Sequence, residues 1–175
     1  REVEEDCTAL KTIFGVQEIG FGVPFTVCGE REIRIIKKHV RYIRLSEYAT
    51  SFALPKDPYH IPIHALYNDP DVMEKIAAFS ENDLPDSLFV MAGHSYEFDN
   101  ESAPVQWEKF EEILANLYQY RDGYWAATNL EIYDYVQAMM KIRRSADGKM
   151  LYNPPDIDVW VSYKDEPLKI GACQT

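Results

Sequence analysis

Stretches with helical spacing of apolar residues alternate with short strand-like runs from residue 3 to about residue 143. The helical pattern predicts helices over residues 3–14 and 30–39, and further helices beginning near residues 69, 102 and 129. The intervening runs predict strands over residues 19–25, 40–45, 88–92 and 124–127. Residues 46–68 hold three prolines and are expected to form a long irregular loop. This alternation predicts an α/β fold built from parallel βαβ units.

Several helix ends carry recognisable boundary signals. Gly15 stands where a helix-terminating glycine is expected, and Asp69-Pro70 fits an N-cap followed by a first-turn proline. Ser102-Ala-Pro104 has the same starting character for the next helix. Thr128 and Glu131 fit a capping box, in which each side chain satisfies a backbone donor beside the other. The capping box fully accounts for Glu131, so we assign it no catalytic role.

The carboxyl-terminal segment changes character. Asp147-Gly148 is a hairpin signal, and residues 149–152, 157–163 and 168–170 predict antiparallel strands. We therefore expect an α/β body over residues 1–144, with residues 145–175 as a β appendage packed on the same domain.

Composition excludes several classes of protein. The chain has 175 residues, of which 46% are hydrophobic, enough for one domain with a core. No apolar run approaches the ~20 residues of a membrane helix. The net charge of −11, without a basic patch, argues against nucleic acid as a partner. Three cysteines without metal-ligand spacing predict neither a disulfide framework nor a zinc ribbon, and favour a reducing compartment such as the cytoplasm.

The stretch from Leu88 to Asp99 is the most chemically suggestive part of the chain. Its five apolar residues, 88–92, predict a short strand buried on both faces, and a glycine ends it. His94, Glu97 and Asp99 then follow. Residues just past the carboxyl end of a parallel strand line the ligand crevice of α/β folds. His94 is thus either a functional residue or a structural cap of the strand, and position alone leaves both open.

A second pair of histidines, His60 and His64, lies four residues apart. Prolines in the same segment exclude a regular helix, so the spacing itself does not indicate a metal pair. A loop could still bring the pair together with Asp57 or Asp69. A metal hydrolase using His60, His64 and Asp99 therefore stays an alternative.

Val23-Pro24-Phe25 ends one predicted strand. Its backbone amides could form an oxyanion hole, or the proline could simply end an edge strand. The chain has no Gly-x-Ser-x-Gly elbow, no phosphate loop and no dinucleotide motif. Its twelve tyrosines and three tryptophans include rings able to stack on sugars, although most are expected in the core.

Four motifs resemble one family in particular. They are Gly93-His-Ser-Tyr-Glu-Phe-Asp99, Trp125-Ala-Ala-Thr-Asn-Leu-Glu-Ile-Tyr-Asp-Tyr-Val136, Asp147-Gly-Lys-Met-Leu-Tyr-Asn-Pro154 and Ile157-Asp-Val-Trp160. Together they closely resemble bacterial polysaccharide deacetylases of carbohydrate esterase family 4, over residues 3 to 160 with few gaps.

The resemblance implies a distorted (β/α) barrel, usually of seven strands, that removes acetyl groups from N- or O-acetylated sugars. It implies a divalent metal, commonly zinc, with an aspartate as base and a histidine as general acid. His94 matches that histidine, and Tyr96 beside it is expected to contact the sugar. Pro24 and Phe25 match a tyrosine-proline-phenylalanine-glycine motif whose amide binds the oxyanion. Here Val23 replaces the tyrosine and Thr26 replaces the glycine.

The family's Thr-Phe-Asp-Asp-Gly and His-Ser/Thr-x-x-x-His motifs, which supply the base and the metal ligands, do not occur in residues 1–175. The chain therefore resembles the carboxyl-terminal half to two-thirds of a deacetylase, and its start at Arg1 suggests a piece of a longer protein. We expect no metal site and no activity from this part alone, and self-association through open sheet edges. The alternative is a non-catalytic carbohydrate-binding module that uses exposed aromatic residues such as Tyr96 and Trp125.

Overall fold

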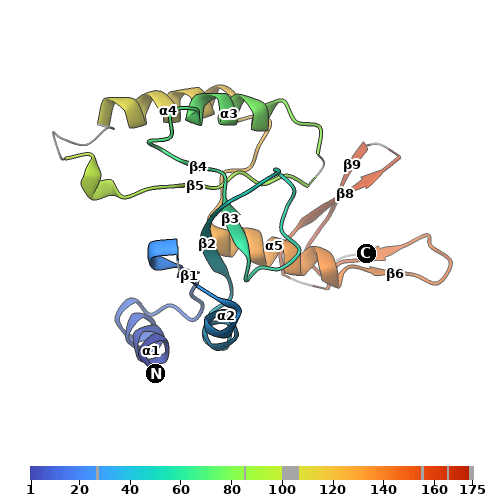
Figure 1. The fold of residues 1–175 in the computed structure, drawn as a ribbon. Coiled ribbons are helices and arrows are strands. Elements are labelled where there is room, and N and C mark those ends of the chain that lie inside the picture. Colours follow the sequence, from blue (N-terminus) through green and yellow to red (C-terminus); the bar gives the residue numbers. More distant parts are fainter. Residues whose placement is uncertain (27, 85, 100–106, 155, 165, 174–175) are drawn as a thin grey trace. The chain divides into compact units, whose positions relative to one another are not determined.

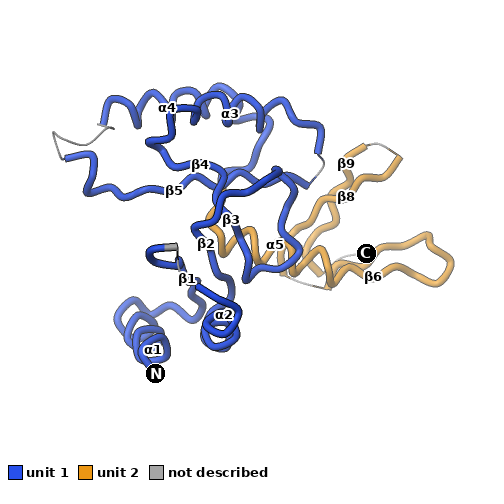
Figure 2. Tube along the Cα trace, in the orientation of Figure 1, with its two compact units in different colours: residues 1–126 blue, residues 127–175 orange. Residues whose placement is uncertain are grey.

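The computed structural model describes residues 1–26, 28–84, 86–99, 107–154, 156–164 and 166–173. The chain divides into two compact units, residues 1–126 and 127–175 (Figure 2). Helices and small sheets occur in both, so the predicted α/β class is confirmed (Figure 1). Within the described ranges the strands form small open sheets and no closed barrel.

The first unit contains helices and parallel strands, which alternate except where β2, β3 and β4 follow one another without a helix between them. In chain order its elements are α1 (Glu2–Phe14), β1 (Phe21–Gly22), the 3-10 turn η1 (Pro24–Thr26), α2 (Glu30–Ile36), β2 (Ile43–Tyr48), β3 (Ile61–Ile63), β4 (Ala65–Leu66), α3 (Val72–Ser80), β5 (Met91–Ala92), the 3-10 turn η2 (Ser95–Glu97) and α4 (Trp107–Gln119). Strands β1, β2 and β3 form one parallel sheet, and β4 pairs with β5 in a second parallel sheet. The predicted parallel pairing is therefore observed in both sheets.

Two separate groups of buried side chains hold this unit together. The first joins α1, α2 and β2 around Cys7, Ile33 and Ile43. The second joins β4, α3 and α4 around Ile76 and Ile113, both of which have no exposed surface. Burying an aliphatic side chain of this size contributes roughly 1.5–3 kcal/mol, so these positions carry much of the stability of the unit.

The second unit consists of one helix and two antiparallel ribbons. Its elements are α5 (Asn129–Lys141), β6 (Arg143–Arg144), β7 (Leu151–Tyr152), β8 (Val159–Tyr163) and β9 (Glu166–Ile170). The pairs β6–β7 and β8–β9 are both antiparallel, as predicted for the tail. Gly148 has φ +72° in the first hairpin, which is a conformation that glycine adopts without strain. The predicted appendage, residues 145–175, lies wholly in this unit, together with α5.

The two best-defined local predictions are confirmed. Gly15 has φ 66° directly after α1, and Thr128 and Glu131 form the expected reciprocal capping box at the start of α5. The helix predicted from Asp69-Pro70 begins later, at Val72, because the Asp69 carboxylate accepts a hydrogen bond from the Leu66 amide instead of capping a helix. The predicted start at residues 102–104 lies outside the described residues.

Two predictions about strands are wrong. The segment 46–68 is not one irregular loop, because β3 and β4 lie within it. Residues 124–127 form no strand, and the Tyr124 hydroxyl instead donates to the Leu117 carbonyl, 3.0 Å away. Pro62 is compatible with β3 because that strand lies at an edge of the described sheet. On its outer side no neighbouring strand needs a backbone N–H from it.

The strand before His94 is shorter than predicted. Only Met91 and Ala92 form β5, and both are half-buried, although Leu88 is buried. The earlier residues pair elsewhere: the Leu88 amide donates to the Phe52 carbonyl, and the Val90 amide donates to the His64 ring. A side chain therefore takes the place of a strand carbonyl at the Val90 amide, whereas the Val90 carbonyl still accepts from the His64 amide.

Candidate functional site

His94 lies just past the carboxyl end of β5, where the sequence places it, and η2 follows directly. Its side chain is 64% exposed, and its Nδ1 lies 3.5 Å from Oε1 of Glu97. The rings of His94 and Tyr96 are 5.1 Å apart, and Tyr96 is also exposed. The structure thus brings together an accessible histidine, a carboxylate and an aromatic ring.

The backbone of His94 is held by a buried tyrosine that the sequence did not reveal. The Tyr67 hydroxyl donates to the His94 carbonyl, 3.3 Å away, and the Tyr67 amide donates to the Ala92 carbonyl. A Cβ at Gly93 would lie 1.6 Å from Cε1 of Tyr67. Gly93 is therefore required by this close approach of backbone and ring, in addition to ending the strand.

Asp99 does not belong to the His94 group, because its carboxylate accepts a hydrogen bond from Nε1 of Trp107 at 2.8 Å. This contact fixes the second residue after η2 to the start of α4. Of His94, Glu97 and Asp99, the geometry joins the first two and assigns Asp99 to packing.

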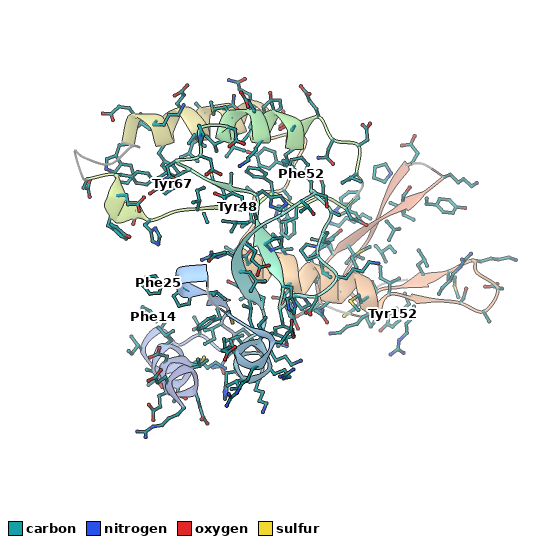
Figure 3. All side chains as sticks on the ribbon, viewed as in Figure 1. Phe14, Phe25, Tyr48, Phe52, Tyr67 and Tyr152 are labelled. Atoms are coloured by element: carbon teal, nitrogen blue, oxygen red, sulfur yellow. The ribbon has the colours of Figure 1, made fainter. Side chains whose placement is uncertain are left out.

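Pro24 and Phe25 form η1, directly after the carboxyl end of β1. Phe25 has φ 54°, which a bulky residue rarely adopts, and its side chain is 92% exposed (Figure 3). The preceding Val23 is buried, and its carbonyl accepts a hydrogen bond from the Ser46 hydroxyl. The turn thus carries an exposed aromatic residue, and the residue before the turn is held in place by burial and by a hydrogen bond. It follows a strand of the three-stranded sheet, whereas His94 follows a strand of the other sheet.

The structure does not bring His60 and His64 together as a metal pair. Nδ1 of His60 lies 2.8 Å from the Asp57 carboxylate, and its Nε2 lies 3.3 Å from the Glu30 carboxylate. His64 is buried, with Nδ1 accepting from the Val90 amide and Nε2 lying 3.2 Å from the Ser51 carbonyl. Both nitrogens of each ring are therefore already engaged.

His64 is best described as a structural histidine. Its ring stacks on Phe52, with centroids 5.5 Å apart. Burial lowers its pKa, only partly offset by its hydrogen bond to Ser51, so the neutral ring is the form that the fold favours.

Within the described ranges, no three side chains of histidine, cysteine, aspartate or glutamate converge as a metal site. The residues present therefore do not fit the divalent metal that the family resemblance implies, and we derive no step through a metal. Nor does any helix among the described residues have the length and apolar character to cross a membrane.

A polar cluster that sequence reasoning missed lies where β2 and β4 end. The Asp69 carboxylate accepts hydrogen bonds from the Tyr48 hydroxyl at 2.8 Å, the Lys75 ammonium at 2.9 Å and the Leu66 amide at 3.0 Å. Lys75 also pairs with Asp71 at 3.0 Å. The sequence around Asp69 predicts a helix cap. Nothing next to Asp69 in the sequence indicates its contact with Tyr48, because Tyr48 lies 21 residues earlier.

These contacts determine the charge state of the cluster. Burial raises the pKa of Asp69, but its hydrogen bonds to Lys75, Leu66 and Tyr48 lower it by more, so the net shift is downward. Burial lowers the pKa of Lys75, but its bonds to Asp69 and Asp71 raise it by more. The pair is thus charged throughout the neutral range, and it fixes the carboxyl end of β2 to α3.

The contact between His60, Asp57 and Glu30 predicts a dependence of stability on pH. Burial lowers the pKa of His60, but its bonds to Asp57 and Glu30 raise it by more, and the net shift is upward. Lys37 is the further charged group near Asp57. Because the pKa of His60 is higher in the folded chain than the free histidine value of about 6.5, its contacts stabilise the fold fully below about pH 6.5. This stabilisation is lost as the pH rises through the folded-state pKa.

We therefore expect the destabilisation caused by His60→Gln to be larger at pH 5.5 than at pH 8, as measured by urea unfolding of variant and parent at each pH. His39→Gln, at a histidine outside this cluster, is the matched control. An equal effect of His60→Gln at both pH values would contradict the assignment.

Comparison with known proteins finds no relative of the chain: no protein-family model, no curated protein and no solved structure matches it.

Proposed function

We propose that this chain is the carboxyl-terminal part of a metal-dependent polysaccharide deacetylase, which hydrolyses acetyl groups from N- or O-acetylated sugars. The observation that carries the proposal is the position of His94: an exposed imidazole, next to a carboxylate and a tyrosine, directly after a parallel strand. This is where a general acid of an α/β enzyme meets its substrate. The parallel pairing of β1, β2 and β3 in one sheet, and of β4 with β5 in another, supports the finer proposal of a partial (β/α) deacetylase barrel.

In this proposal His94 protonates the leaving group. As the carbon–nitrogen or carbon–oxygen bond to the acetyl carbon breaks, a ring N–H of His94 gives its proton to the departing sugar nitrogen or oxygen. Glu97 faces Nδ1, which leaves Nε2 as the nitrogen directed to the substrate. The Tyr67 hydroxyl fixes the His94 backbone, so the ring starts from a defined position.

Three further residues are proposed to contact the sugar. Tyr96 presents a ring that is 69% exposed beside His94, and an exposed aromatic face stacks well on the apolar side of a pyranose. Pro24 and Phe25 form the substrate-binding turn that the family resemblance assigns to the oxyanion. The chemistry of base and metal is proposed to come from the two family motifs that residues 1–175 lack.

Release of acetate from N-acetylchitotetraose tests the proposal. Residues 1–175 alone should release no acetate. The longer protein that, in this proposal, contains them should release acetate in a zinc-dependent reaction. If that longer protein binds the oligosaccharide but releases no acetate with any divalent metal, the deacetylase proposal is wrong.

A zinc titration of the 175-residue chain separates this proposal from the local metal site. We expect no stoichiometric heat of binding in calorimetry, because the imidazoles of His60 and His64 are held by other groups. Tight binding of one zinc ion, abolished by His60→Ala or His64→Ala, would instead establish a site within this chain.

Self-association is a further expected property. Strands β1 and β3 lie at the two edges of their sheet in the part of the chain that the structure describes, and unpaired edges bind further strands. Light scattering after size exclusion should show a mass above that of the 20.3 kDa chain. A monomer across a concentration series would remove this expectation.

A second candidate is a carbohydrate-binding module without catalysis. The exposed rings of Tyr96 and Trp125 favour it, since both are more than half exposed. It predicts heat of binding with chito-oligosaccharides in the absence of metal. An absence of heat in that titration would leave this alternative without support.

A further inference from the structure

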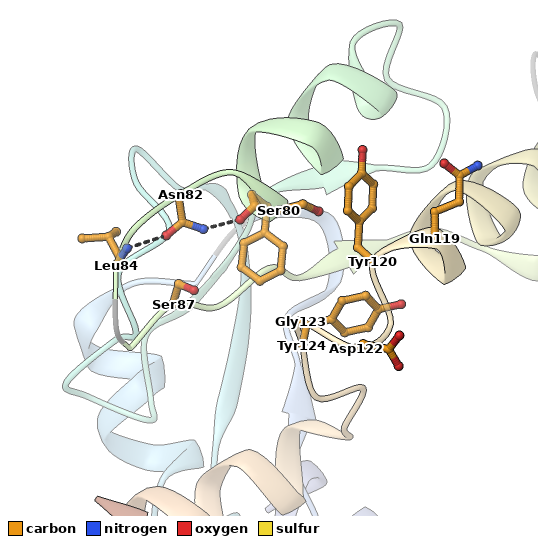
Figure 4. Close-up of a pocket in the computed structure, with 10 residues that line it drawn as sticks. Ser80, Asn82, Leu84, Ser87, Gln119, Tyr120, Asp122, Gly123 and Tyr124 are labelled. Atoms are coloured by element: carbon orange, nitrogen blue, oxygen red, sulfur yellow. Dashed lines mark hydrogen bonds between the residues drawn. The ribbon is translucent and has the colours of Figure 1, made fainter. Parts of the chain in front are cut away.

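A pocket of about 360 Å³ lies between the carboxyl-terminal ends of α3 and α4. Figure 4 shows Asn82, Leu84 and Ser87 on one side of it and the rings of Tyr120 and Tyr124 on the other. This volume is at the lower end of the range for small-molecule sites, which are concave and combine apolar walls with a few polar groups. The pocket is distinct from the His94 group, because its lining residues come from the segments 79–87 and 119–124 and include neither His94, Tyr96 nor Glu97.

Part of the polar lining is used to build the pocket. Asn82 accepts from the Leu84 amide at 3.0 Å and donates to the Phe79 carbonyl, which closes the turn after α3. The Tyr124 hydroxyl donates to the Leu117 carbonyl at 3.0 Å, which fixes that ring against α4. These hydrogen bonds fix both side chains in position, and the two residues shape the walls of the pocket.

Other polar groups of the lining are uncommitted. The Ser87 hydroxyl, the Gln119 amide and the Tyr120 hydroxyl line the pocket and make no side-chain hydrogen bond among the described residues. The Tyr120 ring is half-buried and packs at the edge of the core formed by β4, α3 and α4, so its position is defined. The pocket therefore offers donors and acceptors around a fixed aromatic ring.

The charges of the lining restrict the ligand. Asp122 supplies the single carboxylate among the described lining residues, and none of these is lysine, arginine or histidine. The chain also has a net charge of −11. Phosphate, carboxylate and nucleotide ligands would meet no counter-charge here. A neutral ligand with one apolar face and several hydroxyl groups fits the aromatic ring and the uncommitted polar groups.

From these features we infer that the pocket between α3 and α4 binds a pyranose residue of a neutral oligosaccharide, stacked on Tyr120. Ser87 and Gln119 hydrogen-bond the sugar hydroxyls from its two sides. This binding does not rest on the deacetylase proposal, because it uses neither His94 nor an acetyl group.

Amide chemical shifts of the 175-residue chain, titrated with cellotetraose and separately with N-acetylchitotetraose, test the inference. We expect saturable shifts at residues 82–84, 86–87 and 119–124 with both sugars. Tyr120→Ala should weaken binding about tenfold, the effect of losing one aromatic contact. Ser87→Ala and Gln119→Ala, at positions that carry no internal bond, should each weaken it about threefold or more.

Tyr118→Ala is the matched control, since Tyr118 is an exposed tyrosine of α4, two residues before Tyr120, that does not line the pocket. It should leave the affinity unchanged. If Tyr120→Ala fails to fold, the Ser87 and Gln119 variants decide. Shifts confined to residues 93–97, or no shifts with either sugar, would overturn the inference, and the first of these results would still support sugar binding at the proposed His94 site.

Discussion

Replacing His94 by alanine in the longer deacetylase of the proposal lowers acetate release by about 10²–10⁴-fold, the usual contribution of a general acid. The loss should appear in kcat, because the ring acts on the leaving group during bond cleavage. The stability of the protein should hardly change, because the side chain is 64% exposed and packs against little besides Tyr96.

His39→Ala supplies the control for this experiment, since it removes another imidazole outside the His94 group. Initial rates of acetate release at saturating oligosaccharide, with zinc present, give the comparison. Turnover that is unchanged in His94→Ala would remove His94 from the mechanism, and the exposed ring would then be a structural cap.

Asn153→Asp should cause the largest loss of stability within the second unit. Asn153 is fully buried, and its Nδ2 donates to the carbonyls of Ile157, Ile170 and Gly171 at 2.8, 3.2 and 3.1 Å. Its Oδ1 has no partner in the described part of the chain, so the residue acts as a donor. Aspartate would place a carboxylate against three carbonyl oxygens, at an expected cost of about 3–5 kcal/mol.

Hydrogen exchange followed by mass spectrometry localises this effect. Peptides from residues 157–171 should exchange about 10²–10⁴-fold faster in the variant, because local opening becomes easier by the lost free energy. Asn68→Asp, at an exposed asparagine of the first unit, provides the matched control. Undiminished protection of β8 and β9 in Asn153→Asp would show that the three hydrogen bonds contribute little.

Local chemistry explains which parts of the fold could be predicted from the sequence. The glycine after α1 and the capping box of α5 are decided by contacts within four residues, and both were predicted correctly. The Asp147-Gly148 hairpin is of the same kind. Parallel pairing in the first unit followed from the alternation of helices and strands, which is also visible without knowledge of distant contacts.

Contacts across long stretches of chain explain the errors. The segment 46–68 was expected to be irregular because of its prolines, yet Ile61 and Ile63 are buried in β3 against the neighbouring strand. Likewise, His60 contacts Glu30 and His64 replaces a strand partner of Val90, and neither partner is near in sequence. The location of His94 just past the end of a strand was predicted from its own stretch of sequence, whereas the Tyr67 contact that holds its backbone was not.

The pKa values of His60 and His64 are shifted in opposite directions, and the two rings hold the segment 51–60 from its two ends. The protonated His60 ring bonds Asp57 and Glu30, whereas the neutral His64 ring bonds the Ser51 carbonyl and the Val90 amide. Because the pKa of His60 is raised and that of His64 is lowered, both sets of contacts are complete between the two values. Acid loosens the Ser51 end and alkali loosens the His60 end, so this segment is most rigid within a window around pH 6.5.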